Sequence, residues 1–160
     1  MPIILASYIY KTSSKKELSN WILVIMNKNN YVAIMAGGIG SRFWPMSRTN
    51  YPKQFLDILN TGKTLIQSTY NRFAKFIPAE NIYVVTSEEF AGIVKEQLPY
   101  LKEEQILQEP QRKNTAPCIA YAAYKIGKKN PNATLVVAPA DHVILKEIAF
   151  QNHVRAAIQT

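Results

Sequence analysis

Apolar residues gather along the chain into short continuous runs that are separated by segments of mixed polarity. Four runs have the length and β-branched content of buried strands: residues 31–36, 82–86, 105–108 and 134–143, the last passing into a loop. Apolar residues at helical spacing predict helices over residues 64–77, 87–98, 116–129 and 147–159. Strands that alternate with helices through short connections predict an α/β fold with a Rossmann-like, mostly parallel sheet between helices.

Local signals indicate where two of these helices begin and end. Thr64 and Gln67 have the spacing of a capping box, and Pro78 stops the helix that follows them. Ser87, with two glutamates directly behind it, is a favourable start for the next helix, and Pro99 ends it. These signals support the alternation of strands and helices independently of the apolar pattern.

Three loops that are polar or rich in glycine directly follow predicted strands. They begin with a glycine turn after Ala36, the sequence EPQRKNT after Gln108, and PADH after Ala138. Because ligands bind at the carboxyl ends of strands in parallel sheets, we expect these loops to face one crevice.

The first of these loops has the composition of a phosphate site. Three glycines within four residues are followed by three cations with almost no acid between them: Gly37, Gly38, Gly40, Arg42, Arg48 and Lys53. Glycines let backbone N–H groups surround an anion, and fixed cations neutralise its charge. Two familiar phosphate motifs do not fit, because Phe43 replaces the third glycine of the dinucleotide fingerprint and Asp57 replaces the first glycine of a Walker motif.

Composition narrows the class of protein further. With 160 residues, 48% of them apolar and 19% charged, the chain has the size and composition of one globular domain. The net charge of +8 favours an anionic partner, but the cations are scattered and form no basic-aromatic stripe, which disfavours a nucleic-acid groove. No apolar run approaches the roughly 20 residues of a membrane span.

The single cysteine, Cys118, excludes an internal disulfide and a thiolate metal cluster. A reducing, cytoplasmic location is the simplest inference from this cysteine usage. The apolar neighbours of Cys118 predict a buried thiol on a helix.

Residues 1–30 have a different character and are expected to form an N-terminal extension outside the domain of residues 31–160. Their apolar start is too short and lacks the basic residues of a secretory signal. Ser14 to Glu17 match a capping box for a short helix that reaches Ile25. Met26, just ahead of a polar spacer, is a plausible alternative start.

Three motifs together closely resemble the sugar nucleotidyltransferase family, and within it the mannose-1-phosphate guanylyltransferases. They are AGGIGSRFWPMSRTNYPKQF (36–55), EPQRKNTAPCIAYAA (109–123) and VVAPADHVI (136–144). The resemblance implies the nucleotide-diphospho-sugar transferase type of fold, here truncated. It also implies attack by mannose 1-phosphate on the α-phosphorus of GTP, giving GDP-mannose and pyrophosphate.

The same resemblance implies roles for individual residues. The glycine loop with Ser41 would hold the triphosphate, Arg42 would act on the pyrophosphate side, and Lys53 would stabilise charge at the α-phosphate. Asp141 would ligate Mg²⁺. The implied nucleotide-binding residues are Gly37, Gly38, Gly40, Ser41, Glu109, Pro110, Asn114 and Thr115.

Bland readings of these residues stay open beside the functional ones. Asp141 could cap a turn after its strand, Asn114 and Thr115 could cap a helix without any ligand, and Arg48 could bind the loop to its own surface. Members of the family continue well past residue 160 with the sugar-phosphate half of the site. We therefore expect weak nucleotide binding and little turnover from this chain, and a homo-oligomer is possible for the complete enzyme.

Two further functions also stay open. One is a non-catalytic nucleotide-binding module, and the other is a nucleotidyltransferase that uses another base or another sugar 1-phosphate. Neither nucleic acid nor a membrane is an expected partner.

Overall fold

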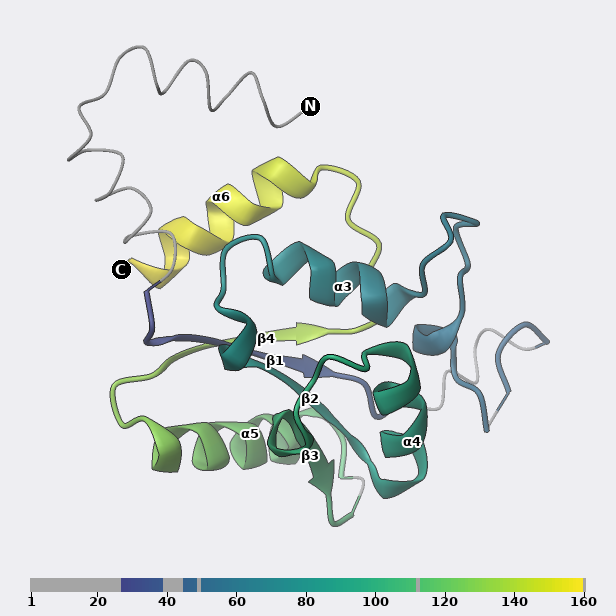
Figure 1. Cartoon of the computed structure of the whole chain (residues 1–160), viewed down its shortest axis with the longest axis horizontal. Helices are drawn as coiled ribbons and strands as arrows, with labels where there is room; N and C mark the ends of the chain where they lie inside the picture. The colour runs from purple at the N-terminus through teal and green to yellow at the C-terminus, as the bar shows by residue number, and fades with distance from the viewer. Residues whose placement is uncertain (1–26, 39–44, 49, 112, 160) are drawn as a thin grey trace.

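The computed structural model describes residues 27–38, 45–48, 50–111 and 113–159, and these form a parallel sheet flanked by helices (Figure 1). The sheet has four strands in the order β3-β2-β1-β4. The strands are β1 (Asn30–Met35), β2 (Ile82–Ser87), β3 (Ile106–Glu109) and β4 (Thr134–Pro139). The predicted short helix before Ile25 and the alternative start at Met26 lie outside the described residues.

All pairings in the sheet are parallel, so the carboxyl ends of the four strands lie along one edge. Met35 in β1 pairs with both Val85 in β2 and Pro139 in β4. Ser87 in β2 pairs with Glu109 at the end of β3. The loops that leave β1, β3 and β4 therefore start from neighbouring points, as the sequence predicts.

The two faces of the sheet are covered by different helices (Figure 1). One face packs against α3 (Leu65–Phe73), α4 (Glu88–Gln97) and α6 (Glu147–Ile158), and the other packs against α5 (Thr115–Lys129). Strand β1 shows the reason, because its side chains alternate between the faces. Val32 and Ile34 join the core under α3, whereas Tyr31 and Ala33 join the core under α5.

The predicted elements agree closely with the observed ones. The capping box at Thr64 is present, since Thr64 Oγ1 accepts from the Gln67 amide while Gln67 Oε1 accepts from the Thr64 amide. Helix α3 nevertheless ends at Phe73, before the predicted limit, and Phe76 packs in the core from the turn beyond it. Strand β4 ends at Pro139, where its pairing with β1 ends.

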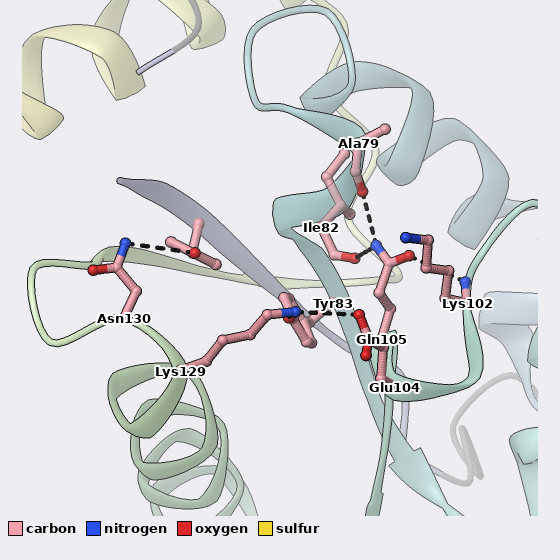
Figure 2. Close-up of polar contacts among 9 residues, drawn as sticks. Ala79, Ile82, Tyr83, Lys102, Glu104, Gln105, Lys129 and Asn130 are labelled. Atoms are coloured by element: carbon pink, nitrogen blue, oxygen red, sulfur yellow. Dashed lines mark hydrogen bonds and ion pairs between the residues drawn. The ribbon is translucent and has the colours of Figure 1, made fainter. Parts of the chain in front are cut away.

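Two buried amide side chains hold the backbone at the amino-terminal edge of the sheet. Asn81 Nδ2 donates to the carbonyls of Lys28 (2.8 Å) and Asn30 (3.0 Å). Gln105 Nε2 donates to the carbonyls of Ala79 (2.8 Å) and Ile82 (2.7 Å), as Figure 2 shows. Each amide thus donates to two backbone carbonyls at or beside the start of a strand.

A lysine from α5, on the other face of the sheet, also makes contacts at the amino-terminal edge. Lys129, in the last turn of α5, donates to the Tyr83 hydroxyl at 3.0 Å and to Glu104 at 3.2 Å (Figure 2). The hydrogen bond with Tyr83 raises the pKa of Lys129.

Within the described residues, no helix is long and apolar enough to cross a membrane.

Candidate functional site

A cleft of about 590 Å³ lies at the carboxyl edge of the sheet, opposite the edge that Asn81 and Gln105 hold. Its walls come from the ends of β1, β3 and β4, from the start of α5 and from a single 3-10 turn, η2 (Lys53–Phe55). Six of the residues that the sequence predicts for nucleotide or metal binding line it: Gly37, Gly38, Glu109, Asn114, Thr115 and Asp141. The structure therefore brings together the three motifs that the sequence singles out.

An ion pair joins two of these motifs beside the cleft, which Asp141 lines. Lys53 Nζ lies 2.6 Å from Asp141 Oδ2. Both side chains are partly exposed, at 24% and 29%, so an incoming ligand can reach the pair. The predicted catalytic cation and the predicted metal ligand are thus direct neighbours, although they are far apart in the sequence.

The η2 turn explains why three consecutive residues serve three different environments. A 3-10 helix has three residues per turn, so successive side chains point in directions about 120° apart. Lys53 extends to Asp141, Gln54 lies beneath the glycine loop, and Phe55 is buried in the core against Phe90, with ring centroids 5.8 Å apart. The buried Phe55 fixes the turn, which in turn fixes the position of Lys53.

Gln54 is a site residue that the sequence reasoning missed. Its side chain is 3% exposed, and its Nε2 donates to the carbonyls of Ala36 (3.0 Å) and Gly38 (2.8 Å). Thr86 Oγ1 also donates to the Ala36 carbonyl, at 3.1 Å. The only signal in the sequence is a polar residue between the lysine and the phenylalanine of PKQF, which does not reveal burial.

The glycine loop approaches β3 so closely that a side chain at Gly37 would be crowded. A Cβ built at Gly37 would lie 3.2 Å from Glu109 Oε2.

Cys118, near the start of α5, is 6% exposed and also lines the cleft, which confirms the predicted buried thiol. Burial raises the pKa of Cys118 to about 11, and the charge of the adjacent Glu109 and a hydrogen bond with it add to the increase.

Asn114 occupies the N-cap position of α5, but its side chain makes no capping hydrogen bond. Its backbone has φ 65° and ψ −165°, a region that glycine favours and that strains other residues. The amides of Thr115 and Ala116 begin the helix, where N–H groups lack intrahelical partners. The amino end of α5 thus presents donors and positive dipole potential beside the cleft.

Other predicted residues lie outside the cleft or outside the described residues. Pro110 lies in a separate depression beside the start of α4, with Ser87 and Glu88. Arg48 is exposed, and its backbone pairs with that of Tyr51. Gly40, Ser41 and Arg42 lie outside the described residues.

The incomplete Walker segment forms a turn whose backbone amides donate to the carboxylate of Asp57. Asp57 Oδ2 accepts from the Gly62 amide at 2.7 Å, and Oδ1 accepts from the Thr61 amide at 3.0 Å. Gly62 has φ 78°, a backbone conformation that glycine adopts at no steric cost. The backbone donors that could hold a phosphate are therefore occupied by Asp57, which agrees with the rejection of a Walker site.

Comparison with known proteins places the chain in a family. Residues 31–160 match the nucleotidyl transferase family model, so the chain belongs to this family. Mannose-1-phosphate guanylyltransferase of Escherichia coli (strain K12) is 43% identical to it over 132 residues, which is 80% of this chain and 27% of that protein. The alginate biosynthesis protein AlgA of Pseudomonas aeruginosa is 45% identical over 120 residues, covering 74% of this chain and 24% of that protein.

A solved structure shares the same fold. The crystal structure described as mannose-1-phosphate geranyltransferase from Thermus thermophilus superposes with a TM-score of 0.70 and 30% identity, over 80% of this chain and 37% of that chain. The chain thus spans about a quarter of the length of the curated relatives it matches.

Proposed function

We propose that this chain carries the nucleotide-binding half of a mannose-1-phosphate guanylyltransferase. In a protein of the relatives' full length, the reaction would join GTP and mannose 1-phosphate to give GDP-mannose and pyrophosphate. The observation that carries the proposal is the 2.6 Å contact between Lys53 and Asp141, because Asp141 lines the cleft together with Gly37 and Gly38. Similarity to named guanylyltransferases at about 43% identity supports the choice of substrates.

The residues of the cleft suit transfer of a nucleotidyl group between two anions. An oxygen of the sugar 1-phosphate forms a bond to the α-phosphorus of GTP, while the bond from that phosphorus to pyrophosphate breaks. Such a reaction requires charge neutralisation and alignment rather than a nucleophilic side chain. Lys53 supplies a cation for the α-phosphate, and the backbone of Gly37 and Gly38 permits close approach of the phosphate chain.

The remaining residues are given the following roles, those of Arg42, Gly40 and Ser41 resting on the resemblance of the first motif alone. Arg42 is proposed to bind the pyrophosphate side, together with the backbone of Gly40 and Ser41. Glu109, Asn114 and Thr115 form the opposite wall of the cleft and are proposed to contact the base and ribose. Pro110, which lines a separate depression, would act by directing the chain between β3 and α5.

The carboxylates in the cleft fit a magnesium ion that is held partly by substrate. Asp141 and Glu109 both line the cleft, and within the described residues no group of three or more His, Cys, Asp or Glu side chains could form a protein-only metal site. Mg²⁺ usually takes one or two carboxylates and completes its shell with phosphates and water. We propose Asp141 as its ligand here, where the ion would neutralise phosphate charge.

Titration of the chain with each of five nucleoside triphosphates tests the proposal. Isothermal calorimetry with Mg²⁺ should show tighter binding of GTP than of UTP, dTTP, CTP or ATP. Chelation of the metal should weaken binding, because the phosphates and Asp141 then repel each other. Preferential binding of another base would overturn the choice of guanine, and failure to bind any of the five would overturn the nucleotide site itself.

A further inference from the structure

We propose that Gln54 is a positioning residue that holds residues 36–38, the start of the glycine loop, at a fixed place relative to Lys53. Its amide donates both protons to carbonyls on the two sides of Gly37, namely those of Ala36 and Gly38. Gln54 directly follows Lys53 in the η2 turn, so the same short stretch of backbone positions both side chains. The two halves of the phosphate site are thereby connected through one side chain.

The support beneath Gln54 is itself firmly held. Phe55 is 1% exposed, and its carbonyl accepts a hydrogen bond from Gln97 Nε2 at 2.9 Å. The turn closes on itself, because the amides of Phe55 and Leu56 donate to the carbonyls of Pro52 and Lys53. Movement of the glycine loop away from Lys53 must therefore break the bonds of Gln54.

The chain contains a matched control for this role. Gln105 is also 3% exposed and also donates from its amide to two backbone carbonyls, but it lies at the opposite edge of the sheet. Gln105 also accepts from the Lys102 amide at 3.0 Å, so its replacement should cost at least as much stability as that of Gln54. Only Gln54 should affect the site.

Amide exchange measured by NMR tests the contact without any ligand. Gln54→Met keeps the length of the side chain and removes both donors, and Gln105→Met does the same at the other edge. We expect Gln54→Met to speed exchange of the Ala36 amide, which donates to Val85, by about tenfold, with little change at Asn81. Gln105→Met should do the reverse, because the backbone amide of Asn81 lies in the chain between Ala79 and Ile82, whose carbonyls accept from Gln105.

Calorimetry with GTP and Mg²⁺ then tests the consequence, which rests on the proposed function. We expect the dissociation constant to rise about tenfold in Gln54→Met and to stay within about twofold in Gln105→Met, although Gln105→Met should lose at least as much stability. If wild-type chain does not bind GTP, the proposed function fails, while the exchange pattern still decides the role of Gln54.

The positioning role is overturned if the two variants change the Ala36 amide equally, or if Gln54→Met binds GTP as tightly as wild type. Should either Met variant fail to fold, Gln54→Asn and Gln105→Asn repeat the comparison, because each keeps the amide on a shorter side chain. The same reciprocal pattern is expected from that pair. Equal effects on both amides would again overturn the role.

Discussion

The two edges of the parallel sheet use similar polar side chains for different purposes. At the amino-terminal edge, Asn81 and Gln105 satisfy backbone carbonyls, and Lys129 closes a contact between layers. At the carboxyl edge, Gln54 makes the same kind of double contact, but beside it Lys53 pairs with Asp141, which lines the cleft. The first edge holds strands together, whereas the second keeps charges ready for a ligand.

The carboxyl edge also contains a strained backbone conformation. Asn114 holds a conformation that favours glycine at the mouth of the cleft, without a capping hydrogen bond to compensate. Strain of this kind costs roughly 1–3 kcal/mol and often occurs at ligand sites. The carboxyl edge therefore gives up stability for the arrangement of its groups, and substitutions at the two edges should separate function from stability.

The largest separation is expected from Lys53→Ala. In a protein of the relatives' full length, turnover should fall by about two orders of magnitude, because a well-placed donor contributes roughly 2.7–4 kcal/mol in the transition state. The free energy of unfolding should change little, since the ion pair with Asp141 is partly exposed. Lys63→Ala, at an exposed loop position, is the control, and turnover near wild type in Lys53→Ala would remove Lys53 from the catalytic residues.

Asn81→Ala should have the opposite profile. Loss of the side-chain amide removes the buried hydrogen bond to the Asn30 carbonyl and the partly buried one to the Lys28 carbonyl, which should lower the free energy of unfolding by about 2 kcal/mol. GTP affinity measured well below the melting temperature should not change. Urea denaturation compares it with Asn132→Ala at an exposed position, and equal stability of the two variants would contradict this role of Asn81.

Asn114→Gly should stabilise the fold while it weakens the site. Glycine relieves the strain at φ 65°, so we expect the free energy of unfolding to rise by about 1 kcal/mol. GTP should bind less tightly, because the proposed contact from the amide is lost. Asn60→Gly, at φ 51° outside the cleft, is the control. Unchanged GTP affinity in Asn114→Gly would show that the side chain of Asn114 does not contact the nucleotide.

A smaller, pH-dependent effect is expected where α6 joins α3. The hydrogen bond from Lys75 lowers the pKa of Glu147 below its usual value of 4.5, and the charges of Lys75 and Arg72 assist. A lowered folded-state pKa stabilises the fold above the unfolded-state value, and this contribution is lost as the pH falls through the folded-state pKa. Glu147→Gln should therefore flatten the decrease in stability below about pH 4.5, and an unchanged pH profile would contradict the pairing.

Much of the fold follows from local patterns in the sequence. The apolar runs at residues 31–36 and 82–86 predict β1 and β2 to within one residue at each end, because strands buried on both faces need continuous apolar sequence. The spacing of Thr64 and Gln67 alone predicts the capping box, which is present. The convergence of three loops follows from the parallel order of the strands.

The details of the site depend on contacts that sequence spacing does not encode. Gln54 is buried because the turn that Phe55 anchors lies under β1, a tertiary fact with no local signal. Pro110 follows Glu109 directly, yet the chain leaves β3 there and turns Pro110 toward α4. The ion pair between Lys53 and Asp141 likewise depends on how β4 is placed beside β1.

The most direct test of the account is an exchange footprint of bound nucleotide. Amide hydrogen exchange of the chain should be compared with and without GTP and Mg²⁺. We predict slower exchange at Gly37, Gly38, Thr115 and Asp141, and unchanged exchange at Asn81 and Gln105. Protection at the amino-terminal edge, with none around Gly37 and Asp141, would contradict the assignment of the carboxyl edge as the nucleotide site.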